Sequence, residues 1–221
     1  MKDISREEFI ALAPARYGSK SPELIKNPLW NYLMFSNEDP YLYRDKFESS
    51  AFDDIEKPLW CNERFGRTIT ETPNGDFILI GGEHEDSYDP DFFIYNDVVV
   101  FPHNGSFQMY LYRREDFLPT DNHTSTLVND QIYIIGGLRY AEDRVPNLTT
   151  VYRLNLSTFH IEKISTSGDM PGWIYKHNSK YVAEKNEIVV SDGTIYHESK
   201  EYIENSSVFI LNLDKLAWKR C

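Results

Sequence analysis

The sequence predicts an all-β fold made of three successive four-stranded antiparallel units, preceded by a short helical segment. Aromatic residues make up 14% of the 221-residue chain, with 15 Tyr and 13 Phe. Rings fit a pleated, half-buried strand surface better than most polar side chains do. An apolar run closed by glycine also recurs three times, at spacings of 55 and 56 residues. Recurrence at such a period is typical of architectures that stack one structural unit several times.

The second strand of each predicted unit carries the clearest signal. Apolar runs that end in glycine occupy 76–82, 131–137 and 187–193. The first two runs close on Gly-Gly, whereas the third keeps only Gly193. Glycine at this point permits a backbone turn that a Cβ atom would obstruct, and it lets the neighbouring unit approach closely. Each run therefore predicts a strand followed by a tight turn.

Three weaker signals accompany each run in the same order. A first strand is expected just upstream, where His123 and His177 are 54 residues apart and the matching region of the first unit is near 67–68. A third strand is expected after a polar loop, at 97–101, 151–156 and 208–213. One aromatic residue then follows in each unit: Phe107, Phe159 and Trp218. We expect these rings on the fourth, outer strand, where they fill the gap between units.

The first 64 residues contain no glycine-closed run and predict short helices instead. A Ser-x-x-Glu capping box predicts a helix over 5–12. An asparagine followed by proline predicts a second helix over 27–35. We expect these aromatic-rich helices to lie against an open face of the repeat. The expected organisation is a helical or irregular N-terminal cap at 1–64, followed by three units at about 65–118, 119–168 and 169–221.

The repeated pattern resembles the kelch repeat of galactose-oxidase-type β-propellers, in which an apolar run with Gly-Gly, a later Tyr and a later Trp define a four-stranded blade. The resemblance covers residues 65–221 and implies three kelch-like blades. Closed propellers have more blades than three. The resemblance therefore implies that the N-terminal segment caps the open edges, that two chains dimerise to complete the ring, or that the set stays open.

The chain is acidic, with 35 acidic against 23 basic residues and a net charge of -12. Such a surface repels a phosphate backbone and an anionic membrane, so neither nucleic acid nor membrane is an expected partner. Eight acidic residues and no Lys or Arg lie between Thr68 and Tyr112, which concentrates the charge in the first unit. This charge attracts and steers a basic protein partner.

The loop after Gly82 is the first candidate binding site, because acidic residues are densest there. The predicted partner-binding residues of this loop are Glu83, Glu85, Asp86, Tyr88, Asp89 and Asp91. A merely solvated loop is the alternative, since neighbouring carboxylates also stay hydrated or bond loop amides. A metal site is a further alternative, although the spacing fits no EF-hand loop. We expect no cofactor.

Three histidines are the candidate metal ligands, should the protein bind a metal: His84, His123 and His177. Equivalent positions of a blade array converge near its axis, where such side chains are placed to bind a metal or to perform acid–base chemistry. The structural alternative is that each histidine forms a hydrogen bond with the backbone of the next unit. A Pro-Gly-Trp turn adds Trp173 to the partner-binding candidates. If its indole is buried instead, it plugs the gap between two units.

Standard catalytic signatures are absent from the sequence. The start shows no secretory signal, and no apolar stretch is long enough to span a membrane. We therefore expect a non-catalytic, cytoplasmic protein of bacterial type that binds and blocks a basic partner, as immunity proteins do to toxins. The alternatives are an enzyme or a metal- or sugar-binding propeller with an axial Glu/His/Asp pocket, and a scaffold that dimerises into a six-bladed ring.

Overall fold

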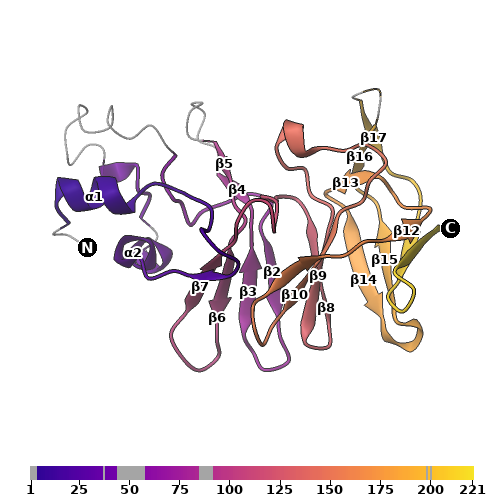
Figure 1. Ribbon diagram of the computed structural model, residues 1–221, viewed down its shortest axis with the longest axis horizontal. Coiled ribbons are helices and arrows are strands. Elements are labelled where there is room, and N and C mark those ends of the chain that lie inside the picture. Colours follow the sequence, from indigo (N-terminus) through magenta and orange to yellow (C-terminus); the bar gives the residue numbers. More distant parts are fainter. Residues whose placement is uncertain (1–3, 37, 44–57, 85–91, 198, 200) are drawn as a thin grey trace.

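The structure is a computed structural model that describes residues 4–36, 38–43, 58–84, 92–197, 199 and 201–221. Three antiparallel sheets follow one another along the chain (Figure 1) and contain most of its regular structure. The core of each sheet is a meander of four strands in sequence order, as the repeat predicts. The all-β class is therefore confirmed, and two short helices precede the first sheet.

The three sheets have strand orders β1-β7-β6-β3-β2, β11-β10-β9-β8 and β12-β19-β18-β15-β14. The first sheet is formed by β1 (Glu23–Leu24), β2 (Thr68–Glu71), β3 (Phe77–Ile80), β6 (Val98–Phe101) and β7 (Gln108–Leu111). The second is formed by β8 (Thr124–Val128), β9 (Gln131–Ile135), β10 (Val151–Asn155) and β11 (Ile161–Lys163). The third is formed by β12 (Ser167–Gly168), β14 (Asn178–Val182), β15 (Glu187–Ser191), β18 (Phe209–Asn212) and β19 (Ala217–Arg220).

The sheets differ from the predicted pattern at their outer strands. β1 adds to the first sheet beside β7, and β12 adds to the third sheet parallel to β19. The expected position of the repeated aromatic residue is correct only for Trp218, which lies in β19. Phe107 and Phe159 precede β7 and β11 instead. Phe159 lies in a turn with a positive φ of 55° and stacks on Tyr110 at 4.4 Å, so it still packs between two sheets.

The predicted N-terminal helices are confirmed. Helix α1 (Arg6–Leu12) begins at a complete capping box on Ser5, and α2 (Pro28–Ser36) begins at Asn27, whose carboxamide oxygen accepts from two backbone N–H groups. Both helices pack on the outer face of the first sheet, as Figure 1 shows. No helix formed by the described residues is long and apolar enough to cross a membrane.

Three apolar layers hold the stack together. The first lies between the N-terminal segment and the first sheet, and it includes the stacked indoles of Trp30 and Trp60. The second joins the facing sides of the first and second sheets, and the third joins the second and third sheets. The central strands of the first and second sheets alternate their side chains between two of these layers. The first and second sheets are therefore apolar on both faces.

The first strands of the three sheets lie beside one another, β2 next to β8 and β8 next to β14. Paired hydroxyl groups bridge each junction at 2.6 Å, Thr68 with Ser125 and Thr126 with Ser179. The two junctions are thus built in the same way, although they join different sheets.

A buried ion pair connects the segment before the first sheet to that sheet. The guanidinium of Arg64 donates to both carboxylate oxygens of Asp97, at 2.6 and 2.9 Å, and both side chains are almost fully buried. The same group lies 3.3 Å from the ring centre of Tyr95 and donates to the carbonyl of Gly81. Charge, ring and carbonyl together compensate the loss of hydration of this cation.

The second sheet has a buried arginine at the corresponding turn, in different surroundings. Arg139 donates to the carbonyl of Gly136, the first glycine of the second doublet. Thr150 occupies the position that corresponds to Asp97. Its carbonyl accepts from the N–H of Gly136, just as the carbonyl of Asp97 accepts from the N–H of Gly81. The guanidinium lies over the rings of Tyr152 and Trp173, at 5.3 and 5.4 Å. Aromatic rings here occupy the place of a directly paired carboxylate.

We expect Asp97→Asn to lower the free energy of unfolding by about 3–5 kcal/mol, because it leaves the charge of Arg64 buried without its partner. Urea unfolding followed by circular dichroism measures this change. Glu162→Gln is the matched control, since it breaks the exposed pair with Arg153 and should change stability by less than about 1 kcal/mol. Equal effects of the two substitutions would contradict the assigned role of the buried pair.

Candidate functional site

The connections between the second and third strands rise on the same side of all three sheets, as Figure 1 shows. In the first sheet this connection contains β4 (Glu83–His84) and β5 (Phe93–Ile94), and in the second it contains the turn η2 (Ala141–Asp143). In the third sheet it contains β16 (Thr194–Tyr196) and β17 (Tyr202–Glu204), which extend a small sheet that begins with β13 (Trp173–Tyr175). We call the described residues of these three connections the rim.

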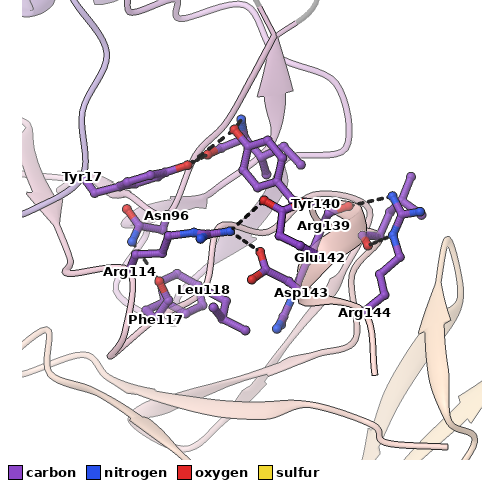
Figure 2. Close-up of polar contacts among 12 residues, drawn as sticks. Tyr17, Asn96, Arg114, Phe117, Leu118, Arg139, Tyr140, Glu142, Asp143 and Arg144 are labelled. Atoms are coloured by element: carbon purple, nitrogen blue, oxygen red, sulfur yellow. Dashed lines mark hydrogen bonds and ion pairs between the residues drawn. The ribbon is translucent and has the colours of Figure 1, made fainter. Parts of the chain in front are cut away.

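Hydrogen bonds tie the N-terminal segment to the first two connections of the rim. The Tyr17 hydroxyl donates to the carbonyl of Ile94 at 3.1 Å and lies 3.4 Å from the Tyr140 hydroxyl. The Tyr140 hydroxyl accepts from the N–H of Ile94 at 2.9 Å (Figure 2). Burial, together with the neighbouring Tyr140, raises the pKa of Tyr17 well above its ordinary value. The Tyr17 hydroxyl therefore stays protonated and acts as a hydrogen-bonding group.

Two arginines continue this network across the second connection to the third. Arg114 donates to Asp143 at 2.7 Å and lies over the ring of Tyr140, with Glu142 at 3.4 Å (Figure 2). Arg144 donates to two backbone carbonyls and to the Tyr202 hydroxyl at 2.8 Å. One continuous set of contacts therefore fixes the rim from the N-terminal segment to the third sheet.

The described residues of the rim expose apolar side chains from all three connections and acidic side chains from the second and third. Its exposed large apolar residues are Phe92, Val145, Tyr202, Ile203 and Val208. Its exposed acidic residues are Glu142, Asp192, Glu201 and Glu204. Aromatic and aliphatic side chains surrounded by charges are typical of surfaces that bind another protein. Because the network holds the rim in place, such a surface is ordered before a partner arrives.

Part of the predicted acidic loop belongs to this rim. Glu83 pairs through its backbone with Phe65 and is half-buried. The other predicted residues of this loop, Glu85, Asp86, Tyr88, Asp89 and Asp91, lie outside the described residues. His84 is buried, and its Nδ1 lies 3.2 Å from the carbonyl of Glu63 while its ring stacks on Tyr41. It also lines a small pocket with the carboxylates of Glu38 and Asp39.

Trp173 is buried, with 2% of its surface exposed. Its indole N–H donates to the carbonyl of Leu138 at 3.2 Å, and its ring lies beside Arg139. The second alternative given for this residue, a plug between two sheets, therefore describes its position in the structure. A partner that meets the rim does not reach this side chain, because it is buried against Leu138 and Arg139 of the second unit.

His123 and His177 each bond to a neighbouring unit, although the partner is a threonine side chain of the preceding unit and not the backbone of the next one. The Nε2 atom of each lies 2.9 Å from a threonine hydroxyl of the preceding first strand, that of Thr68 and of Thr124 respectively. Burial lowers the pKa of His123 to about 3, with Arg139 contributing, and lowers that of His177 to about 4. In the part of the chain that the structure describes, no three His, Cys, Asp or Glu side chains gather to hold a metal ion.

The two buried histidines predict a pH dependence of folding. In the unfolded chain a histidine takes up its proton near pH 6.5, whereas in the folded protein His123 and His177 stay neutral to about pH 3 and 4. The unfolded state therefore binds more protons below pH 6.5, and stability should fall as pH falls from there. Where the histidine is fully protonated in the unfolded chain and still neutral in the folded one, each histidine lowers the free energy of unfolding by about 1.4 kcal/mol for every unit by which the pH falls.

Urea unfolding between pH 5 and pH 6.5 measures this slope, above the range in which ordinary carboxylates titrate. His123→Asn should reduce this slope by the contribution of one proton, since the unfolded variant binds one proton fewer. His103→Gln, which changes an exposed histidine, should leave the slope unchanged. An identical slope in wild type and His123→Asn would show that the buried ring does not have the assigned neutral state.

The residues that organise the rim were not found from the sequence. Tyr17, Arg114 and Tyr140 lie in three separate segments, and none belongs to a motif. One signal was available, because every repeat has a long connection at the same point between its second and third strands. Loops at equivalent points of stacked units lie side by side.

Comparison with known proteins adds nothing further: no protein-family model matches the sequence, and no curated protein is significantly similar to it.

Proposed function

We propose that this chain is a non-catalytic protein-binding module whose rim contacts a basic partner and blocks it, as immunity proteins block toxins. The observation that carries the proposal is the hydrogen-bonded network that fixes three connections and the N-terminal segment into one surface. That surface exposes apolar side chains among carboxylates, in a chain of net charge -12. An ordered acidic surface of this kind favours fast, salt-sensitive association with a basic protein.

We further propose that the three sheets are kelch-type β-propeller blades. Three features support this assignment: the four-stranded meanders, their adjacent first strands, and the Gly-Gly turns after β3 and β9. Gly81 and Gly136 both have positive φ, and a Cβ atom there would lie 2.3 and 2.2 Å from a carbonyl oxygen of the neighbouring segment. The glycines thus serve the close approach between units that the repeat requires.

The environment of the histidines supports a binding module more than an enzyme with an axial pocket. Nε2 of His123 and of His177 is engaged by a threonine, and both rings are buried. A ring formed by two copies would require the N-terminal segment to leave the first sheet. That segment buries Phe9, Trp30 and Trp60 against the sheet, so its release would expose a large apolar surface.

Recovery of partners from a lysate of the native host, with the tagged chain as bait, tests the function. We expect one predominantly basic protein, bound in a 1:1 complex, whose association slows as salt is added. A purified complex then allows binding kinetics to be measured. Capture of no partner, or binding that is indifferent to salt, would overturn the proposal.

Reversing a single charge on the rim tests where the partner binds. Glu142→Lys is expected to slow association by about tenfold at low salt, because it places a cation in the path of a basic partner. Glu184→Lys changes net charge by the same amount in η3 (Ala183–Lys185), in the hairpin that points away from the rim in Figure 1. Stopped-flow or surface-plasmon kinetics compare the two. Equal slowing by both would place the contact outside the rim.

A further inference from the structure

The third connection of the rim ends in a strand with a free edge. β17 pairs with β16 on one side and is the last strand of the small sheet β13-β16-β17. All three of its residues are exposed, with Tyr202 at 53% and Ile203 at 45%. Within the described residues, no strand pairs with its other side.

The register of this hairpin fixes which backbone groups face outward. The N–H of His197 donates to the carbonyl of Glu201, and the N–H of Asn205 donates to that of Gly193. Hydrogen-bonded and non-bonded pairs alternate along an antiparallel ladder, so Ile203 is bonded to β16 whereas its two neighbours are not. The N–H and C=O groups of Tyr202 and Glu204 therefore point away from the sheet.

The edge lacks the features that usually prevent strand addition. Proteins protect exposed edges with lysine, proline or bulges. The sequence of β17 is Tyr-Ile-Glu, whereas β11, the outer strand of the second sheet, ends in Lys163. β17 is also held in an extended, ordered form, because Tyr202 accepts a hydrogen bond from Arg144 and packs against the rings of Tyr175 and Tyr196.

The charge around the edge indicates what kind of segment fits it. Glu201 and Glu204 place exposed carboxylates at its two ends, and Asp192 follows β15 nearby in the same connection. A strand that pairs with β17 brings its side chains beside Glu204 on one face and beside Glu201 and Ile203 on the other, because successive side chains of a strand alternate between its faces. Cross-strand neighbours of opposite charge stabilise a pair, and like charges oppose it.

We propose that β17 is a docking edge, and that an extended basic segment of the protein partner adds to it as a further antiparallel or parallel strand. Main-chain hydrogen bonds to Tyr202 and Glu204 supply the pairing. Lysine or arginine side chains on the face that carries Glu204, with apolar side chains beside Ile203 on the other face, supply the selectivity. This inference rests on the proposed function, since it specifies how the partner of the rim is recognised. The short strand forms only part of a contact that the rest of the rim extends.

A matched pair of substitutions distinguishes the contribution of the backbone hydrogen bonds from the contribution of the charge to peptide binding. Glu204→Pro removes both the carboxylate and the outward N–H, while the hydrogen bonds of Ile203 to β16 stay available. Glu204→Gln removes the carboxylate alone. The probe is a short synthetic peptide of alternating lysine and valine. Its control peptide has the same number of lysines and valines but carries inserted prolines, which keep the charge and prevent strand pairing.

Titration of the labelled protein, followed by amide NMR and hydrogen exchange, gives the readout. We expect the alternating peptide to protect the amides of Tyr202 and Glu204 and to leave that of Ile203 unchanged. We also expect its affinity to fall by at least about tenfold in Glu204→Pro relative to Glu204→Gln. The wild-type protection pattern keeps the test valid even if the proline variant is unstable.

Three results would overturn the docking edge: no binding of the alternating peptide at millimolar concentration, equal binding of the proline-containing peptide, or equal affinities of the two variants. The fate of the proposed function is read separately, from the capture of a basic partner by the wild-type chain. A captured partner whose affinity is the same for both Glu204 variants would keep that function and reject β17 as the docking edge.

Discussion

Both faces of the first and second sheets are apolar, and an apolar face left in water loses about 25 cal/mol for each Å² that is not covered. Every other part of the architecture follows from the need to cover these faces. The facing sides of neighbouring sheets cover one another. The outer face of the first sheet is covered by α1, α2 and the segment that contains Trp60. The N-terminal segment is therefore a structural part of the stack.

The same constraint explains why the buried charges lie where they do. Arg64 and Arg139 lie at the glycine turns, where the chain leaves the apolar layer and carbonyl oxygens are available to accept hydrogen bonds. The first turn adds a carboxylate to its arginine, and the second adds two aromatic rings. The first two units thus both place a cation at the glycine turn, but each stabilises that cation with different groups.

Periodicity made the central strands predictable, because the second and third strands of each unit carry apolar runs at a constant spacing. The helices were predictable from local signals, since a capping box and an N-cap asparagine act within one turn of helix. The two-residue strands β1 and β12 were not, because so short a segment has no period and becomes a strand only through a partner far away in sequence. The rim was missed for the same reason, as Tyr17 and Tyr140 meet only after the stack has formed.

The histidines and Trp173 illustrate the limit of reasoning from equivalent positions. Their recurrence indicated that His123 and His177 serve the same purpose, and both bond a threonine of the preceding strand. Recurrence did not reveal whether that purpose was chemical or structural. Burial and the contact with a threonine favour the structural purpose, because a ring that stays neutral between two sheets is well suited to packing.

The two outer faces of the stack differ, and this difference gives the array a direction. On the third sheet, the side away from the second sheet carries Lys180 and Lys219 with Glu187, and its Val189 and Ile210 are only half-buried. A further sheet placed there would bury these charges, and one placed before the first sheet would have to displace two helices. The described stack therefore ends in two chemically different faces. An engineered unit designed to pack on one of them would meet lysines at the third sheet, and would meet apolar side chains at the first sheet only after α1 and α2 were removed.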